Sequence, residues 1–493
     1  MIPAIPVDPE RRRQVAGALR AVLPERCVLH DPEDTRPYEC DGLAAYRQLP
    51  MIVTLPDNEE QVLAILKVCR ELKVPIVPRG AGTGLSGGAQ PLADGVVIST
   101  ARLNRILRVE PYARTAVVQP GVRNLAISEA AAPFGLYYAP DPSSQIACTI
   151  GGNVAENSGG VHCLKYGLTV HNVLRVRVCT IEGEVVELGG DSLDAPGLDL
   201  LAVFIGSEGM LGIVTEVTVK LVPKPALAQV IMASFDDVVT GGNAVASVIA
   251  AGIIPAGLEM MDRTSSRMVE PFVKAGYDLE AAAILLCEAD GTALEVAEEI
   301  ERMTEVLQQA GASAIAVSQN EAERLRFWSG RKNAFPAAGR ISADYYCMDG
   351  TIPRKHLAHV LSRIEAMQDT YGLRCANVFH AGDGNMHPLI MFDANKPGEL
   401  QRAEDFGAAI LALCVEVGGT ITGEHGVGVE KIDSMCVQFG ANELEAFFTV
   451  KRAFDPAMLL NPNKAVPTLQ RCAEMGKMRV SGGVLPFADL PRF

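Results

Sequence analysis

The sequence predicts an α+β fold with two or three domains. The chain has 493 residues, which is enough for more than one hydrophobic core. Its first half holds three glycine-rich clusters separated by short β-branched segments, whereas residues 226 to about 370 alternate apolar strands with amphipathic helices. Because Pro223 and Pro225 mark this change, we expect an N-terminal helical segment (1–50), a first domain (51–225), a smaller α+β domain (226–415) and a C-terminal segment (416–493).

The composition is that of an ordinary globular protein and argues against several classes of function. Hydrophobic residues make up 48% of the chain and charged residues 21%, and the formal net charge is −15. This acidic balance argues against binding to nucleic acid or to an anionic membrane surface. No run approaches the ~18 apolar residues of a membrane span, and no apolar region follows Arg11-Arg12-Arg13 as it would in a secretory signal. We therefore expect a cytoplasmic protein.

The twelve cysteines are scattered along the chain and form no C-x-x-C pair. Neither a zinc knuckle nor an iron–sulfur cluster is therefore encoded by their spacing. We expect free, buried thiols, which are typical of proteins in a reducing cytoplasm.

The first regular elements are expected to alternate helix and strand. A polar helix is expected around residues 10–23. Asp57 and Glu60 have the spacing of a capping box at the start of a second helix. The apolar face of that helix is made of Val62, Ile65, Leu66, Cys69 and Leu72. The pattern then predicts strands at 74–78, 96–99 and 116–119 and a helix at 124–134 that Gly135 ends.

The first glycine cluster follows one of these strands, and five of its ten residues from Arg79 to Gly88 are glycines. Such a backbone reaches φ > 0 and lets a ligand come close, and its successive N–H groups form a cradle for a pyrophosphate. Residues 82–87 also fit G-x-G-x-x-G, but Pro91 follows where a Rossmann site needs a helix, and no Gly-Lys-Ser/Thr closes a P-loop. The alternative is a merely flexible loop. We predict a phosphate-binding loop that is not of the Rossmann type.

Two further glycine clusters lie at residues 140–160 and 206–212. Between them, alternating apolar residues predict a hairpin over 173–188 that turns at Glu182-Gly183. The third cluster leads into an alternating strand at 213–221. In the second domain, the pattern predicts a strand at 282–287 and a helix at 294–310.

Two histidines and a glutamate near the C-terminus form a candidate chemical site. His380 and His387 flank a Gly-Asp-Gly-Asn sequence that breaks a helix and favours a hairpin turn. Two imidazoles at one turn can converge on a metal, and Glu424, in Gly-Glu-His-Gly, can add an oxygen ligand. The alternative is a pair of hydrogen-bonded histidines that decorate the turn. A His₂-carboxylate set favours zinc over manganese or iron.

Taken together, these motifs resemble the vanillyl-alcohol oxidase/p-cresol methylhydroxylase superfamily, and within it the FAD-linked 2-hydroxyacid dehydrogenases. The resemblance covers nearly the whole chain and rests on residues 78–89, 149–160, 206–216, 380–387, 423–431 and 455–464. It implies a two-lobed FAD-binding domain of the p-cresol methylhydroxylase type, a smaller cap domain with a ferredoxin-like sheet, and a C-terminal helical return that completes the site. It also implies non-covalent FAD, because covalently flavinylated members use a histidine near the first loop and residues 78–89 contain none.

The resemblance places FAD against all three clusters and the final turn. The implied contacts are Arg79, Gly80, Ala81, Gly82, Thr83, Gly84, Leu85, Asp141, Ser144, Thr149, Gly152, Asn153, Gly159, Gly206, Glu208, Gly212, Ile213, Val214 and Asn461. The final turn departs from the family's Leu-Asn-Pro-Gly-Lys at Asn463. Because asparagine tolerates φ > 0 better than most residues, we expect the turn to survive.

The resemblance also implies the chemistry: a divalent metal on His380, His387 and Glu424, with His425 as general base. Arg331 stands where the family places its carboxylate-binding arginine, and a guanidinium fork suits a carboxylate. The alternative is a solvated surface arginine. Relatives that oxidise 2-hydroxyglutarate have a lysine within the stretch 345–349 and an asparagine at the position of Leu389. Both polar groups are missing here, which predicts a small monocarboxylate substrate, glycolate or D-lactate.

We therefore expect a flavin dehydrogenase that moves a hydride from a 2-hydroxy acid to FAD. The alternatives are a D-lactate dehydrogenase that works as a single chain, a flavin-dependent transferase without net redox change, as in one ether-lipid synthase of the superfamily, and a non-catalytic flavoprotein. The chain has no cluster-type cysteine spacing of its own. The resemblance implies that electrons pass to a second FAD-domain subunit and an iron–sulfur subunit, which would bring the protein to the inner face of the membrane.

Overall fold

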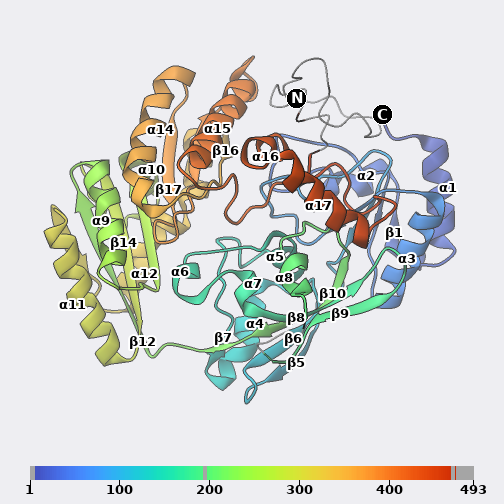
Figure 1. The fold of residues 1–493 in the computed structure, drawn as a ribbon, viewed down its shortest axis with the longest axis horizontal. Coiled ribbons are helices and arrows are strands. Elements are labelled where there is room, and N and C mark those ends of the chain that lie inside the picture. The colour runs from blue at the N-terminus through green and yellow to red at the C-terminus, as the bar shows by residue number, and fades with distance from the viewer. Residues whose placement is uncertain (1–5, 193–196, 468–471, 473–493) are drawn as a thin grey trace.

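The computed structural model describes residues 6–192, 197–467 and 472, and Figure 1 shows its ribbon. Blue and cyan elements from the first half lie on one side, and yellow and orange elements from the second half lie on the other. The chain from residue 416 to 467 is called the C-terminal return. Its red helices, α16 (Ile432–Gln438) and α17 (Ala441–Phe454), lie on the same side as the blue elements. Among the described helices, none is long and apolar enough to cross a membrane.

The first sheet has the strand order β1-β2-β4-β3 and leads into the first glycine cluster. Its strands β2, β4 and β3 run parallel, and β1 pairs antiparallel with β2. Two helices pack on this sheet through buried residues such as Leu19 and Ile65. The elements are α1 (Pro9–Arg20), β1 (Val28–Leu29), α2 (Pro32–Thr35), β2 (Ile52–Thr54), α3 (Glu59–Leu72), β3 (Ile76–Arg79) and β4 (Val96–Ser99), with 3₁₀ turns at Glu25–Cys27 and Arg36–Tyr38.

The second sheet is antiparallel, with the order β5-β6-β10-β8-β9. It carries the second and third glycine clusters on the segments that connect its strands. The elements of this part of the chain are β5 (Ile106–Glu110), β6 (Thr115–Val118), α4 (Asn124–Ala131), β7 (Leu136–Tyr137), α5 (Ile150–Glu156), α6 (Cys163–Tyr166), α7 (Thr169–Asn172), β8 (Val173–Cys179), β9 (Val185–Gly189), α8 (Leu200–Phe204), β10 (Ile213–Lys220) and β11 (Val222–Pro223), with a 3₁₀ turn at Ala132–Phe134. β7 and β11 lie outside the second sheet and pair with each other as a two-stranded ribbon.

The third sheet is the seven-stranded antiparallel sheet of the cap, in the order β15-β12-β14-β13-β17-β18-β16. Its strands are β12 (Leu227–Phe235), β13 (Gly257–Asp262), β14 (Ala283–Gly291), β15 (Ala314–Val317), β16 (Asp344–Cys347), β17 (Cys375–Phe379) and β18 (Pro388–Phe392). Its helices are α9 (Val238–Ala250), α10 (Arg263–Val273), α11 (Ala293–Gln309), α12 (Glu321–Lys332), α13 (Ala334–Ile341), α14 (Leu357–Tyr371) and α15 (Glu399–Glu416), with a 3₁₀ turn at Arg354–His356.

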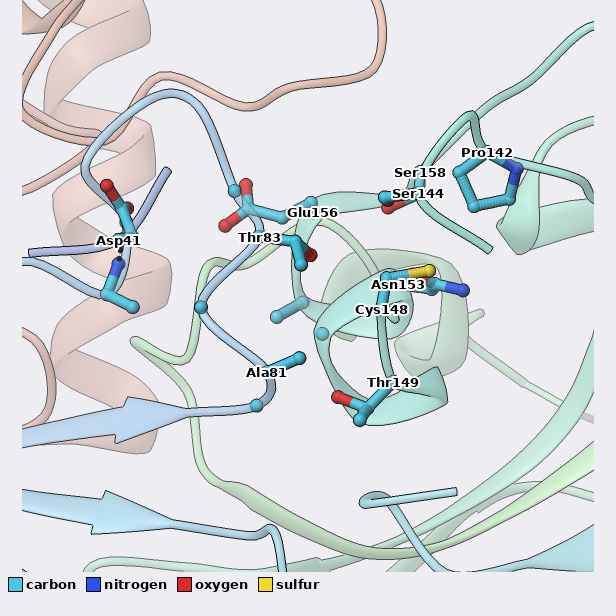
Figure 2. Close-up of a pocket in the computed structure, with 18 of the residues that line it drawn as sticks. Asp41, Ala81, Thr83, Pro142, Ser144, Cys148, Thr149, Asn153, Glu156 and Ser158 are labelled. Carbon is cyan, nitrogen blue, oxygen red and sulfur yellow. Dashed lines mark hydrogen bonds between the residues drawn. The ribbon is translucent and has the colours of Figure 1, made fainter. Parts of the chain in front are cut away.

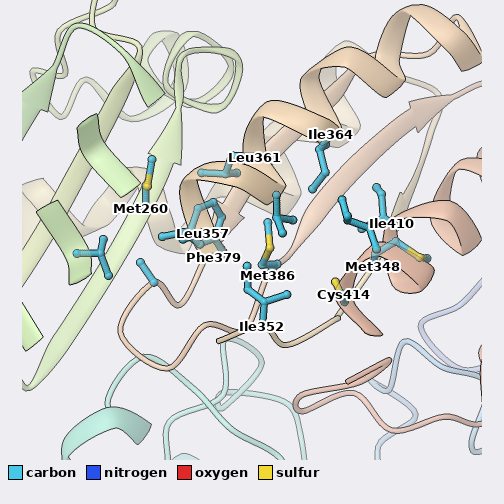
Figure 3. Packing of buried hydrophobic residues seen from close by; sticks show 14 of the residues in the cluster. Met260, Met348, Ile352, Leu357, Leu361, Ile364, Phe379, Met386, Ile410 and Cys414 are labelled. Atoms are coloured by element: carbon cyan, nitrogen blue, oxygen red, sulfur yellow. The ribbon is translucent and has the colours of Figure 1, made fainter. Parts of the chain in front are cut away.

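Helices cover both faces of the cap sheet because its central strands are apolar on both sides. Along β14, Leu285 and Cys287 join one hydrophobic cluster, while Ile284 and Leu286 join another. The first cluster is closed by α9, α11, α14 and α15, and Figure 3 shows Leu357 and Ile410 among its members. The second is closed by α10, α12 and α13. The predicted α+β cap domain is thus confirmed, and its sheet is antiparallel.

Backbone hydrogen bonds tie the C-terminal return to the first sheet, and a buried ion pair braces the return internally. Ile76 N–H donates to Leu459 O and Asn461 N–H donates to Ile76 O, so the chain runs alongside β3. Lys451 Nζ donates to the Asp455 carboxylate and to the carbonyls of Met210 and Leu460. The turn at Asn463 survives as expected, since its φ is 63°.

Two local predictions were wrong. The cap of α3 is Asn58, whose side chain accepts from Gln61 N–H, while Asp57 instead pairs with Arg26. The expectation that all thiols are free also fails. Cys436 in α16 and Cys472 form a disulfide with their Cα atoms 5.4 Å apart, and the ten remaining cysteines are free. Their 36-residue separation carries no pattern that announces this pair.

Candidate active site

A cavity of about 520 Å³ is lined by the first sheet, the second sheet, the cap and the C-terminal return. Figure 2 shows its walls near Ala81, Thr83 and Glu156. Residues 78–85 form one wall, and His387, Glu424 and His425 also line it. The cavity therefore connects the predicted phosphate loop to the predicted chemical site.

The phosphate loop leaves β3 after Arg79 and packs directly on the second glycine cluster. A Cβ on Gly80 would lie 2.4 Å from Thr149 Oγ1, and one on Gly82 would lie 2.2 Å from the Arg79 guanidinium, so both positions need glycine. No helix follows, in agreement with the non-Rossmann prediction. Thr149 Oγ1 and Asn153 Nδ2 line the cavity and have no hydrogen-bond partner among the described residues. Such orphaned polar atoms fit a site built for a polar cofactor.

The predicted hairpin is present, and it brings the two histidines together. His380 and His387 flank the turn between β17 and β18, and each is only 3% exposed. Glu424 Oε1 lies 3.4 Å from His380 Nε2 and 3.1 Å from His387 Nε2. The candidate ligand atoms of these three residues all lie within 4.8 Å of one another. His387 Nδ1 has no hydrogen-bond partner among the described residues, and His387 Nε2 faces the Glu424 carboxylate without an aligned hydrogen bond, as expected of a ring placed to bind a metal.

Asp349, at the end of β16, organises the loop that carries Glu424 and His425. Its carboxylate accepts from the backbone N–H groups of Gly423, Glu424 and His425 at 3.1, 3.1 and 2.8 Å. Lys431 Nζ lies 3.2 Å away, and both side chains are fully buried. Asp349, His387 and His425 form a second group with ligand spacing, but these hydrogen bonds already occupy the Asp349 oxygens. The set His380, His387 and Glu424 is therefore the better metal candidate.

The electrostatics of this cluster follow from burial and close partners. Burial opposes the charge of Glu424, yet His380 and His387 hold its pKa well below its ordinary value. Burial lowers the pKa of His425 to about 4. The His425 ring stacks on His387 at 4.9 Å, and its Nδ1 has no hydrogen-bond partner among the described residues.

A pair of buried carboxyl groups lies where the phosphate loop meets the Glu-His-Gly loop. Glu208 accepts from Val427 N–H and Gly428 N–H at 2.7 Å each, which pins that loop to the third glycine cluster. Glu156 faces the same place, and its Oε2 has no hydrogen-bond partner among the described residues. Burial and then the charge of Glu208 raise the pKa of Glu156 well above its ordinary value.

Arg331 is not among the residues that line the cavity. Its side chain is 1% exposed, and Nε donates to Glu259 Oε2 at 2.5 Å. The next residues along the chain, Lys332 and Asn333, do line the cavity. A solvated surface arginine is thus excluded, and the carboxylate-binding role stays a prediction.

Most of the remaining predicted site residues line the cavity, and the others do not. Those that line the cavity are residues 79–85, Ser144, Thr149, Gly152, Asn153, Glu208, Gly212, Ile213, Val214, His387, Glu424 and His425. The residues that do not line it are Asp141, Gly159, Gly206, His380 and Asn461. Asn461, for example, donates to Gly88 O and Glu208 O and accepts from Lys464.

Comparison with known proteins fits this arrangement. Residues 50–189 match the FAD binding domain family, and residues 224–465 match the C-terminal domain of FAD linked oxidases. Glycolate oxidase subunit GlcD of Escherichia coli (strain K12) is 63% identical over 98% of this chain and 97% of its own length. The chain belongs to the FAD-linked oxidases.

A second relative and a solved structure are less similar to this chain. D-lactate dehydrogenase of Anaerostipes hadrus is 33% identical over 90% of this chain and 95% of that protein. The solved structure of p-cresol methylhydroxylase with substrate bound superimposes with a TM-score of 0.78 at 17% identity, covering 95% of this chain and 99% of that chain. The predicted fold type is therefore confirmed, and FAD is the cofactor that this family membership supports.

The sequence of this FAD-linked oxidase does not reveal the buried charged residues that contact the candidate site residues. Glu259 lies in no motif. Glu156 and Lys431 lie within the motif stretches 149–160 and 423–431 but have no role assigned to them, and Asp349 appears only within the stretch 345–349, which differs from relatives. Each comes from a different element and meets its partners only in the folded chain. The one available signal is that they are charged residues among apolar neighbours, as Glu259 is within Gly257–Asp262.

Gly426→Ala is predicted to disrupt the cavity far more than a matched glycine change. The new Cβ would lie 2.0 Å from Glu156 Oε2, at a φ of 81°. Gly418→Ala is the control, because its φ is 86° but nothing lies within 4 Å of its Cβ. The control should lose about 1–2 kcal/mol of stability in thermal unfolding and keep its flavin. Gly426→Ala should in addition lose flavin absorbance, and equal flavin content in the two variants would contradict this prediction.

Proposed function

We propose that this chain oxidises glycolate to glyoxylate with FAD as the hydride acceptor, as the FAD-linked subunit of a glycolate oxidase. The observation that carries the proposal is the position of His425 beside His380, His387 and Glu424 at the cavity wall. The 63% identity to a protein of that name supports the substrate. Oxidation of D-lactate by the same site is the second candidate, which the relative from Anaerostipes hadrus favours.

The proposed roles divide the site between cofactor, metal and substrate. The phosphate loop and the other two clusters would hold FAD without a covalent bond, since residues 78–89 offer no histidine. FAD supplies the acceptor for a hydride from the substrate α-carbon. His380, His387 and Glu424 would hold one divalent metal, with zinc favoured, which supplies Lewis acidity for the hydroxyl oxygen. His425 would take the hydroxyl proton at its unpartnered Nδ1.

A small substrate is supported by two apolar or weakly polar positions that meet in the cap sheet. Cys347 and Leu389 are direct partners across β16 and β18. They occupy the region where relatives that oxidise 2-hydroxyglutarate carry lysine and asparagine. Both side chains are buried and neither carries a positive charge, so this pair offers no cation for a second carboxylate. Arg331 would bind the single carboxylate of the substrate.

Anaerobic addition of glycolate is the decisive test of this function. The flavin absorbance of the purified protein should bleach. Chelator-treated protein should fail to bleach because it lacks the metal, and His387→Ala should fail because it lacks a metal ligand. Restoring zinc, manganese or iron to the chelated protein should restore bleaching. A failure of glycolate and D-lactate to reduce the metal-loaded flavin would refute the proposed oxidation, whereas full bleaching without metal would refute the metal role alone.

His425→Ala should slow flavin reduction by glycolate about 10²–10⁴-fold, the usual loss when a general base is removed. The FAD content should stay unchanged, because the imidazole is proposed to act on the substrate. His359→Ala, an exposed histidine on α14, is the control and should reduce at the normal rate. Rapid-mixing absorbance measures both rates. A His425→Ala rate within a few-fold of normal would move the base elsewhere.

We also propose that the reduced flavin is reoxidised by partner subunits, one with an FAD domain and one with iron–sulfur clusters. The relative from Escherichia coli is called a subunit, and the chain has no cysteine spacing for a cluster of its own. Native pull-down should recover a cysteine-rich partner, and the isolated chain should turn over slowly with oxygen but well with a dye. Recovery of the chain alone, with oxygen turnover as fast as dye turnover, would contradict the proposal.

A further inference from the structure

We propose that Glu259 is a positioning residue that fixes His380 for the metal and Arg331 for the substrate carboxylate. This inference rests on the proposed function of the same site. Glu259 belongs to β13, next to β17, whose end carries His380. Its two carboxylate oxygens are divided between the two partners, so one buried side chain joins the two groups.

The contacts are short, and each uses a different oxygen. Glu259 Oε1 lies 2.6 Å from His380 Nδ1, and Glu259 Oε2 accepts from Arg331 Nε at 2.5 Å. Glu259 and Arg331 are both 1% exposed, and His380 is 3% exposed. Solvent therefore cannot replace either contact, and the geometry of all three side chains is set within the protein.

The contact with His380 selects the tautomer that a metal needs. When Nδ1–H donates to the carboxylate, the lone pair lies on Nε2, which is 3.4 Å from Glu424 Oε1. A carboxylate behind a ligating histidine fixes its ring orientation and raises its basicity, and loss of such a partner typically weakens metal binding by about 10–100-fold. Glu259 would thus act on the metal without touching it.

The contact with Arg331 uses one edge of the guanidinium and leaves another edge unpaired. Arg331 Nη2 is buried and has no hydrogen-bond partner among the described residues. An unpaired buried donor is costly, so its position is explained if a ligand carboxylate completes it. Holding Nε in place fixes the plane of the guanidinium fork, on which two-point binding of a carboxylate depends.

Glu259→Gln tests this because an amide has one acceptor oxygen where the carboxylate has two. His380 Nδ1–H and Arg331 Nε–H are both donors, so the amide NH₂ must face one of them. Glu288→Gln is the matched control. Glu288 lies on the neighbouring strand β14, is 2% exposed and binds Arg324 and Trp328 of the same helix α12, but it forms no hydrogen bond or ion pair with His380 or Arg331.

Zinc and manganese titrations by calorimetry should give about one ion per chain for the unchanged protein and an ion bound about 10–100-fold more weakly by Glu259→Gln. Glu288→Gln should bind like the unchanged protein. In steady-state assays with saturating metal, Glu259→Gln should also raise the KM for glycolate by tenfold or more. If Glu259→Gln does not fold, Glu259→Asp serves instead, since the shorter carboxylate keeps the charge but cannot reach both partners.

The outcomes separate this inference from the proposed function. Absence of metal binding by the unchanged protein would refute the proposed metal site itself. Normal metal affinity and normal KM in the Glu259 variant, beside a metal-binding unchanged protein, would overturn the role of Glu259. Equal losses in the Glu259 and Glu288 variants would also overturn it, because they would reduce the effect to a general loosening of the cap.

Discussion

In this FAD-linked oxidase, the conformation of the loop that carries Glu424 and His425 depends on the carboxylate of Asp349. Three successive N–H groups, from Gly423 to His425, point to it, so it fixes the backbone from which Glu424 and His425 project. A backbone curled around one anion leaves little freedom for its side chains. The anion itself is stable there because Lys431 Nζ is 3.2 Å away and equally buried. Without Asp349, the N–H groups of Gly423, Glu424 and His425 would lose their shared acceptor.

Buried charged side chains recur throughout the site, and most of them have close partners. Isolated buried ions are costly, whereas ions with hydrogen-bonded counter-ions are tolerated. Glu259 has Arg331 and His380, and Glu208 has two backbone N–H groups. Glu156 Oε2 has no hydrogen-bond partner among the described residues, and burial together with the charge of Glu208 raises the pKa of Glu156 well above its ordinary value.

Sequence patterns recovered the features that are local in the chain. The glycine loop after β3, the hairpin that turns at Gly183 and the turn between His380 and His387 all follow from short motifs. Long-range partners were out of reach, because Glu259 and His380 are 121 residues apart and nothing in either neighbourhood points to the other. The capping error has a similar cause: Asp57 and Asn58 both suit an N-cap, and the distant Arg26 binds Asp57.

The candidate site takes its residues from both the cap and the C-terminal return, so it forms only when the whole chain is folded. The cap supplies His380 and His387 on a hairpin, and the C-terminal return supplies Glu424 and His425. Neither segment alone holds the three candidate ligands. Glu208, in the third glycine cluster, accepts hydrogen bonds from the backbone N–H groups of Val427 and Gly428. These bonds connect the glycine-rich lining of the cavity to the loop that carries Glu424 and His425. A shift of this loop would therefore move Glu424 and His425 together relative to His380, to His387 and to the rest of the cavity lining.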